Sequence, residues 1–333
     1  MKILICDYAE PMVRDLDIER GYLYNAFGKD IEIDCFIYDG VKQHLYDHIA
    51  DADVLMSAYL DINEEVLSHA PKLKMISVEA NGYNSIDIKA CEKFGVGVTC
   101  IEEYCTDEVA DHTLTLALTV IRKINEYQND MRNEGVFNFS ARSGLFKLSG
   151  KTWGIVGLGK IGKAVAKRAL AFGCEVVAFD PYASQDDANK LGVSLVSKEA
   201  LLQSSHIISL HAGDNEDTHH IISSENISKM QNSPVIVNVA RGGLVCEEDL
   251  IEALDNGKIF GAGLDVFESE ETEAMKKSPF LKRNDVVITP HTAFYSDDSI
   301  KECGKITSEN IIFYMKGEFD KVRKIVYKPQ EEE

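Results

Sequence analysis

Positive charge is scarce in this sequence. Its 333 residues include 35 Lys and Arg against 55 Asp and Glu, which gives a formal net charge of -20 at pH 7. Such a chain repels polyanions, so we expect no nucleic-acid partner and no binding to an acidic membrane surface. An anionic small molecule would need a local positive group to bind. An Arg within an apolar stretch therefore indicates where such a molecule could bind.

Metal-ligand spacing is also missing. The eight Cys residues are scattered without a Cys-x-x-Cys pair, which suits unpaired thiols in a reducing cytosol. His44 and His48 lie four residues apart, but no third ligand stands at a compatible spacing. In the pair His219-His220, adjacent side chains are expected to diverge. We therefore predict no metal site.

Long apolar runs are absent as well. No segment approaches the ~18 apolar residues of a membrane helix, and the first apolar run, residues 3–6, is too short for a signal peptide. The hydrophobic fraction of 45% is nevertheless enough for a substantial core. We expect a soluble, cytoplasmic protein without a membrane partner.

The hydrophobic pattern predicts an α/β fold, because short runs rich in Val and Ile alternate with longer segments of helical periodicity. The expected strands are residues 2–6, 31–37, 52–57, 74–78, 96–99, 152–156, 175–179, 206–210, 235–239, 260–264 and 285–289. One long helix is expected from Asp107 to about Asn129. A last helix at 299–316 precedes a short strand at 322–326, which could belong to either half of the chain.

A glycine-rich turn follows the strand at 152–156 and opens a helix. In this Gly-x-Gly-x-x-Gly pattern, Gly157 allows the tight turn and Gly159 lets a pyrophosphate approach the backbone. Gly162 lets the helix pack on the strand. A nucleoside-triphosphate loop would need Ser or Thr where Ala164 stands, so we favour a dinucleotide site.

An acidic residue at the end of the next strand indicates which dinucleotide the site binds. Asp180 lies 180 − 162 = 18 residues past the last glycine. A carboxylate there can accept hydrogen bonds from both adenosine ribose hydroxyls and would repel a 2′-phosphate, so NAD is favoured over NADP. The alternative, that Asp180 only starts a turn before Pro181, is compatible with the same geometry.

Charged or polar groups also follow three later strands: Arg241, the acids Glu268 and Glu270, and His291. Ligands of an open parallel sheet bind outside the carboxyl ends of its strands, so these groups can converge on the cofactor. Taken singly, each has an ordinary structural interpretation as a loop cap or a surface charge. Together beside a nicotinamide, they predict hydride and proton transfer.

In their order, these motifs resemble the D-isomer-specific 2-hydroxyacid dehydrogenases. The resemblance covers essentially the whole chain and rests on the glycine turn, Asn-Val-Ala-Arg-Gly (238–242), Leu-Asp-Val-Phe (264–267) with a following Glu, and Thr-Pro-His (289–291). Tyr-Cys-Thr-Asp-Glu-Val-Ala-Asp-His (104–112) and Thr-Pro-His-Thr-Ala-Phe-Tyr (289–295) resemble the branches that include D-lactate dehydrogenases. Glu271 stands where many members have Pro, a departure shared by the lactate-type branch.

The resemblance implies an NAD-dependent oxidoreductase that reversibly reduces a small 2-keto acid to a D-2-hydroxy acid. Arg241 would bind the substrate carboxylate, and His291 would act as general acid and base. Glu270 would pair with His291 and raise its pKa. Because the family motif places the acid five positions after Asp265, Glu270 is preferred to Glu268.

The resemblance also implies residues that bind substrate and cofactor. Backbone amides of the loop at Asn81 and Gly82 would hold the substrate carboxylate, and Ser57, Tyr104 and Phe294 are candidate pocket walls. Aromatic residues here favour an apolar substrate side chain, although such residues are nearly as often plain core. The implied cofactor residues are Gly157, Gly159, Lys160, Ile161, Gly162, Asp180, Pro181, His211, Ala212, Thr218, Ala240 and Asp265.

The domain prediction is two Rossmann-like or flavodoxin-like parallel-sheet domains separated by a cofactor cleft. We place the substrate domain at 1–100 plus 298–333 and the NAD-binding Rossmann domain at 101–297, with hinges that let the cleft close on substrate. The resemblance suggests a homodimer. An alternative stays open: a dinucleotide-sensing, corepressor-like binding protein of the same fold.

Overall fold

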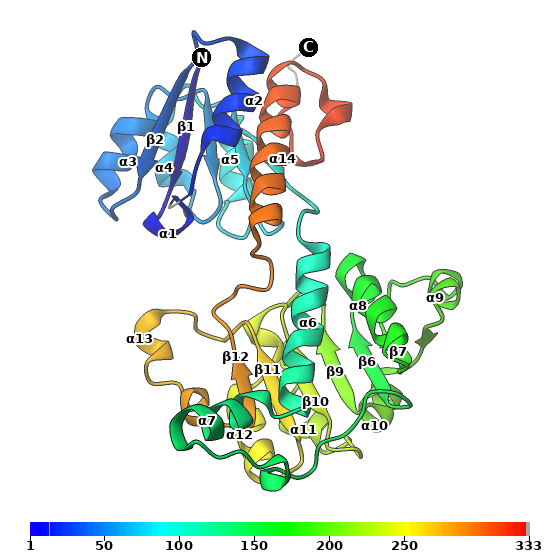
Figure 1. The fold of residues 1–333 in the computed structure, drawn as a ribbon. Helices are drawn as coiled ribbons and strands as arrows, with labels where there is room; N and C mark the ends of the chain where they lie inside the picture. The colour runs from blue at the N-terminus through cyan, green and yellow to red at the C-terminus, as the bar shows by residue number, and fades with distance from the viewer. Residues whose placement is uncertain (13, 331–333) are drawn as a thin grey trace. The chain divides into compact units, whose positions relative to one another are not determined.

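The computed structural model describes residues 1–12 and 14–330, and the chain divides into two compact units. Unit 1 comprises Met1–Tyr104 and the segment from Ser296 onward, and unit 2 comprises Cys105–Tyr295. Each unit is built around its own sheet with helices on both faces (Figure 1). The predicted α/β fold is therefore confirmed.

The sheet of unit 1 has the strand order β13-β5-β4-β3-β1-β2. Its strands are β1 (Lys2–Asp7), β2 (Glu32–Ile37), β3 (Val54–Ser57), β4 (Met75–Val78), β5 (Gly97–Cys100) and β13 (Lys324–Tyr327). All neighbours are parallel except β13, which pairs antiparallel with β5. The last strand thus belongs to unit 1.

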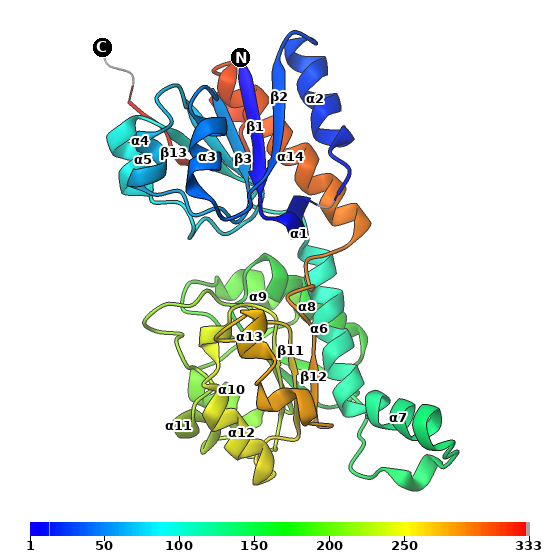
Figure 2. The ribbon, with the colours of Figure 1, turned by 90° about the vertical axis from the view of Figure 1, so that its left-hand side faces the viewer.

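Helices cover both faces of this sheet. They are α1 (Ala9–Met12), α2 (Asp17–Phe27), α3 (Lys42–Ile49), α4 (Glu64–Ser68), α5 (Ile88–Phe94) and α14 (Asp297–Met315). Side chains alternate along β1, so Ile3 and Ile5 pack toward α2 and α14, whereas Leu4 and Cys6 pack toward α3, α4 and α5. Figure 2 shows the resulting three layers.

The sheet of unit 2 is entirely parallel, with the order β12-β11-β10-β9-β6-β7-β8. Its strands are β6 (Thr152–Val156), β7 (Glu175–Phe179), β8 (Ser194–Leu195), β9 (Ile207–Leu210), β10 (Val235–Asn238), β11 (Gly261–Leu264) and β12 (Val286–Ile288). This is the doubly wound nucleotide-binding order with a seventh strand, and its order reverses between β6 and β9. The two-residue β8 is too short to show an alternating pattern in the sequence.

The helices of unit 2 are α6 (Thr106–Ile121), α7 (Ile124–Glu134), α8 (Lys160–Ala171), α9 (Gln185–Leu191), α10 (Lys198–Ser204), α11 (Ser224–Ile227), α12 (Glu247–Asp255) and α13 (Thr272–Met275). Short 3-10 turns span Phe139–Ala141, Gly242–Leu244 and Pro279–Lys282, and a fourth, Phe319–Lys321, lies in unit 1. Within the described part of the chain, no helix has both the length and the apolar character needed to cross a bilayer.

The single long helix expected from Asp107 to Asn129 is wrong, because α6 and α7 are separate helices. The chain turns at Lys123, which takes a left-handed φ of 51°. Neither Gly nor Pro marks this break, and a left-handed non-glycine residue costs about 1–2 kcal/mol. The Lys123 ammonium group compensates by pairing with Glu126 at 3.2 Å and lying 5.7 Å from the ring centroid of Phe260.

Candidate active site

Of the three glycines in the turn, only Gly159 leaves room for a phosphate group. A Cβ on Gly157, which has φ +90°, would lie 2.7 Å from the carbonyl oxygen of His211, and one on Gly162 would lie 2.1 Å from that of Gly157. Among the described residues, nothing lies within 4 Å of a Cβ built on Gly159. The backbone of Gly159 at the start of α8 therefore borders open space, as a pyrophosphate site requires.

Asp180 is fixed between the glycine turn and the loop after β7. Its Oδ2 accepts a hydrogen bond from the Leu158 amide at 2.7 Å, and its Oδ1 accepts one from the Tyr182 amide at 2.8 Å. This geometry satisfies the turn interpretation and also places a carboxylate next to the phosphate-binding turn. Its contact with ribose stays a prediction.

His211 follows β9, directly across the point where the strand order reverses. Burial lowers the pKa of its imidazole to about 3, so the ring is neutral at pH 7. Both ring nitrogens are buried and make no hydrogen bond within the described part of the chain. A neutral imidazole carries one donor and one acceptor, and a polar ligand beside Gly157 would satisfy them. These features fit a bound dinucleotide.

The other predicted cofactor residues lie in the same unit, at the carboxyl ends of its strands. Lys160 and Ile161 begin α8, and the Thr218 hydroxyl closes its loop by donating to the Gly213 carbonyl at 2.6 Å. Pro181, Ala212 and Ala240 follow β7, β9 and β10, respectively. Their contacts with the cofactor stay predictions.

His291 and Glu270 form a hydrogen-bonded pair, with 2.9 Å between Nδ1 and Oε2. The bond to Glu270 raises the pKa of His291 and outweighs the opposing effect of burial. For Glu270, burial acts to raise the pKa, but the bond to His291 lowers it overall. The two side chains are 44% and 45% exposed, so they remain accessible to a ligand. The Nδ1 bond leaves Nε2 as the nitrogen for proton transfer.

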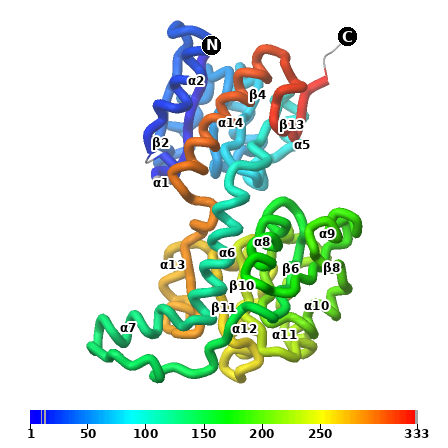
Figure 3. Tube along the Cα trace, turned by 45° about the vertical axis from the view of Figure 1, so that its right-hand side comes forward, coloured from blue at the N-terminus to red at the C-terminus, as the bar shows by residue number. Residues whose placement is uncertain are grey.

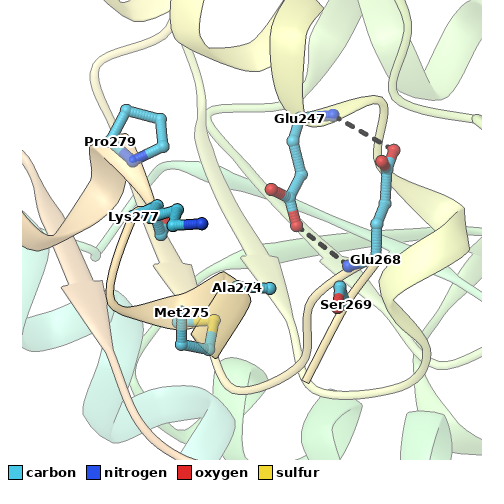
Figure 4. A pocket seen from close by; sticks show the side chains of 8 residues that line it. Glu247, Glu268, Ser269, Ala274, Met275, Lys277 and Pro279 are labelled. Atoms are coloured by element: carbon cyan, nitrogen blue, oxygen red, sulfur yellow. Dashed lines mark hydrogen bonds between the residues drawn. The ribbon is translucent and has the colours of Figure 1, made fainter. Parts of the chain in front are cut away.

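Glu268 has a different set of partners. Its Oε1 lies 3.1 Å from Nε2 of His220, and its amide donates to Oε1 of Glu247 at 2.9 Å. Glu247 and Glu268 line a cavity of about 260 Å³ together with Met275 and Lys277. Figure 4 shows the two glutamates on one side of this cavity. The geometry thus pairs His291 with Glu270, as the motif spacing favoured, and holds Glu268 elsewhere.

Arg241 is exposed after β10 on a turn that two neighbours shape. The buried side chain of Asn238 donates to the Arg241 carbonyl at 2.8 Å and accepts from the Ala240 amide at 3.1 Å. A Cβ on Gly242 would lie 1.8 Å from the Phe267 carbonyl oxygen, so only Gly allows the close approach to the loop after β11.

This packing brings Arg241 within electrostatic reach of His291 and Glu270. Its positive charge contributes to lowering the pKa of Glu270 and opposes the rise in the pKa of His291. Asn238 was not among the predicted site residues. The available signal was a polar side chain inside the apolar strand Val-Ile-Val-Asn-Val.

Asp265 is fully buried and holds the loop that carries His291. Its Oδ1 accepts from the Thr289 hydroxyl at 2.5 Å and the Thr292 amide at 2.9 Å, and its Oδ2 accepts from the Ala293 amide at 2.9 Å. Its carbonyl accepts from the His291 amide at 2.8 Å. These bonds keep His291 in a left-handed conformation with φ 54°. The predicted cofactor contact of Asp265 stays a prediction.

The predicted substrate residues lie in both units. Asn81 and Gly82 follow β4 in unit 1, where the side chain of Asn81 is exposed. Ser57 is 2% exposed, and its hydroxyl donates to Asp7 at 3.1 Å. Tyr104 packs on the cluster of Ile101, Cys303 and Ile306 in unit 1. Phe294 lies in unit 2, with its ring centroid 6.1 Å from that of His291. Their contacts with substrate stay predictions.

The histidine pairs set aside as metal ligands have separate partners. His44 lies 2.8 Å from Asp39, and His48 lies 2.8 Å from Asp34. The expected divergence of His219 and His220 is wrong, since their rings stack with 4.0 Å between centroids. Each of the two rings also lies 3.1 Å from a carboxylate of its own, Asp214 for His219 and Glu268 for His220. Within residues 1–12 and 14–330, no cluster of three or more potential ligands occurs.

Comparison with known proteins now adds to this geometry. Residues 114–293 match the family model described as D-isomer specific 2-hydroxyacid dehydrogenase, NAD binding domain. The chain belongs to this family. It is 36% identical over 281 residues to the glyoxylate reductase of Korarchaeum cryptofilum, covering 83% of this chain and 84% of the relative. The predicted family, dehydrogenase activity and NAD cofactor are therefore confirmed.

Other relatives carry different substrate names. A D-3-phosphoglycerate dehydrogenase of Methanocaldococcus jannaschii is 37% identical over 279 residues, which are 83% of this chain but only 52% of that protein. Among solved structures, a D-lactate dehydrogenase from Aquifex aeolicus complexed with NAD and lactic acid superposes with a TM-score of 0.83 at 30% identity, covering 98% of this chain and all of that chain. The family acts on small 2-hydroxy and 2-keto acids, and these relatives name more than one.

Proposed function

We propose that this dehydrogenase reversibly reduces a small 2-keto acid to the D-2-hydroxy acid. The observation that carries the proposal is the pair of His291 and Glu270 within electrostatic reach of Arg241, at the carboxyl edge of the NAD-binding sheet. Unit 2 would bind the cofactor, and the loop at Asn81 and Gly82 in unit 1 would contribute amide donors for the substrate carboxylate.

Each side chain has a defined task in this reaction. Bound NADH supplies the hydride that C2 of the keto acid receives. His291 donates a proton from Nε2 to the carbonyl oxygen, and Glu270 stabilises the imidazolium that is needed at neutral pH. Arg241 binds the carboxylate of the substrate with its planar fork of donors. In the oxidation direction, neutral His291 accepts the hydroxyl proton.

For the substrate, we propose a short apolar side chain, as in pyruvate. Phe294 packs edge-on against His291 and Tyr295, so an aromatic surface adjoins the proton donor. The similarity to a D-lactate dehydrogenase supports this choice. We expect pyruvate to be preferred over larger apolar keto acids by a small factor, because one methylene group changes the binding free energy by about 1–3 kcal/mol.

The test is NADH oxidation by the purified protein across 2-keto acids of increasing side-chain size, repeated with NADPH. We expect turnover of pyruvate with NADH and a D-configured product on a chiral column. Turnover of a charged or phosphorylated keto acid instead would overturn the substrate proposal. Tight NADH binding without turnover of any keto acid would favour the dinucleotide-sensing alternative.

We also propose a homodimer formed through the segment that contains α7. None of the side chains of α7 is buried, and after it Phe137 and Phe139 are 92% and 93% exposed. Figure 3 shows α7 projecting away from the other elements of unit 2. A second copy of this chain would cover these rings. Sedimentation velocity should give a dimer that the double substitution Phe137→Ser and Phe139→Ser dissociates, and a wild-type monomer would contradict this proposal.

A further inference from the structure

Helix α6 and strand β11 lie against each other in a fixed register. A Cβ on Gly263 would lie 2.7 Å from Cβ of Leu116, and a Cβ on Gly261 would lie 2.6 Å from Cγ1 of Val120. Four residues of a helix advance about 6 Å, and two residues of a strand advance about 6.6 Å, so the two spacings match. The next step of this register brings His112 of α6 to Asp265, just beyond β11.

At this step, the contact is polar. Nε2 of His112 lies 3.0 Å from the Thr289 hydroxyl and 3.6 Å from Oδ1 of Asp265. The Thr289 hydroxyl donates its only proton to Asp265, so it can only accept from His112. The bond therefore requires a proton on Nε2 of His112, which is 21% exposed.

The chain of bonds ends at the proton donor of the reaction. Asp265 holds the amides of Thr292 and Ala293 with its carboxylate and the amide of His291 with its carbonyl. The left-handed conformation of His291 persists only because its surroundings hold it there. A looser Asp265 would let the loop relax and move the imidazole away from Glu270.

We propose that His112 is a positioning residue that, through Thr289 and Asp265, fixes the loop of His291 in the geometry needed for proton transfer. His112 lies in the motif 104–112 and reaches the loop of His291 through Thr289 and Asp265. This inference rests on the proposed function of His291. It explains why a helix that contributes no catalytic side chain carries a histidine on its face toward β11.

Steady-state kinetics and NMR of the full chain test this role together. His112→Leu removes the donor at similar volume, and His112→Gln keeps an N–H donor. We expect kcat to fall roughly 10- to 100-fold in the Leu variant, because small misplacements of reacting groups cost that much. NADH affinity should stay unchanged, and the Gln variant should recover most of kcat.

The NMR arm needs no substrate. The pKa of His291, followed by its ring proton resonances, should fall toward its ordinary value in His112→Leu and remain raised in His112→Gln. Thr115→Ala is the matched control, since Thr115 is exposed on α6 and its hydroxyl donates to the Asp111 carbonyl of the same helix at 2.8 Å. It should change neither kcat nor the pKa of His291.

Other outcomes would overturn the proposal. An unchanged kcat and an unchanged His291 pKa in His112→Leu would do so, as would equal losses in the Gln and Leu variants. If His112→Leu does not fold, Thr289→Val compared with Thr289→Ser tests the same chain, and equal behaviour of the two contradicts it. Full activity of His291→Asn would instead defeat the proposed function, while the NMR arm still decides the role of His112.

Discussion

The carboxyl ends of the two sheets use charged side chains in opposite ways. In unit 2, His291, Glu270 and Arg241 are exposed, and buried groups such as Asp265 hold their loops. In unit 1, by contrast, the side chains of Asp7 at the end of β1 and Glu79 after β4 are themselves buried.

Unit 1 shows this second arrangement at two places. Asp7 is 2% exposed and accepts bonds from the Ser57 hydroxyl and the amides of Ala58 and Tyr59. Arg14 binds both Glu19 and Glu79, whose side chains are 0% and 8% exposed. A buried charged group that forms all its hydrogen bonds within the protein holds a loop in place. An exposed charged group on such a loop can instead contact a substrate.

The largest effect is expected from removing the shared cation of unit 1. Arg14→Met leaves Glu19 and Glu79 buried without a counter-charge, which should lower the free energy of unfolding by about 3–5 kcal/mol at neutral pH. The deficit should shrink as the pH falls, because burial raises the pKa of Glu79 and its protonated carboxyl group needs no cation. Denaturant unfolding followed by circular dichroism measures both effects.

Lys42→Met is the control, since its pair with Glu65 is exposed on both sides and should change the unfolding curve little. If Arg14→Met unfolds like the wild type, buried charges do not stabilise unit 1, and the difference drawn between the two units is wrong.

In unit 2, removing a cation should act on catalysis instead. Arg241→Gln should lower kcat/KM for the keto acid on the order of 30- to 5,000-fold, because a charged contact to the carboxylate is lost. This factor corresponds to a loss of about 2–5 kcal/mol in transition-state stabilisation. Its unfolding curve should match that of the wild type. Arg168→Gln, which breaks surface pairs with Asp107 and Asp111, should keep kcat/KM, and equal losses in the two variants would refute this role.

A smaller effect separates cofactor binding from folding. The φ of Gly159 is -72°, which Ala also adopts, and the Cβ would meet open space in the protein alone. Gly159→Ala should therefore fold normally but weaken NADH binding by about 1–3 kcal/mol, through a methyl group where the pyrophosphate lies. Fluorescence titration measures this affinity. Gly21→Ala in unit 1, also without near neighbours, is the control, and unchanged affinity in Gly159→Ala would exclude the assigned phosphate position.

The smallest expected change is a shift in pH dependence. Keto-acid reduction needs protonated His291, so kcat/KM falls as the pH rises through its pKa. Glu270→Gln removes the main cause of the raised pKa, so this fall should move to lower pH. Glu268→Gln, whose carboxylate pairs with His220, should leave the profile in place. Identical profiles for all three proteins would show that Glu270 does not tune His291.

The sequence predicted the features that local chemistry determines. Strand positions followed from apolar runs, and the three glycines of the turn were recognisable from their spacing. Backbone sterics demand glycine at Gly157 and Gly162, whereas at Gly159 the demand comes from the expected pyrophosphate. The partner of His291 followed from motif spacing, and the structure pairs it with Glu270.

Features set by tertiary contacts were not predictable in the same way. The break between α6 and α7 depends on Glu126 and Phe260 compensating a left-handed Lys123, and no local signal marks it. The bond between His112 and Thr289 joins residues that are 177 positions apart. It arises from the register between α6 and β11, which a single sequence does not show.

The central claim is that His291 is the proton donor on the NAD-binding unit, and one comparison tests it most directly. His291→Asn and His220→Asn each remove an imidazole that pairs with a glutamate in unit 2. On the best keto acid, His291→Asn should lose about 10²- to 10⁴-fold in kcat with unchanged NADH affinity, whereas His220→Asn should behave as wild type. Wild-type kcat in His291→Asn would contradict the account.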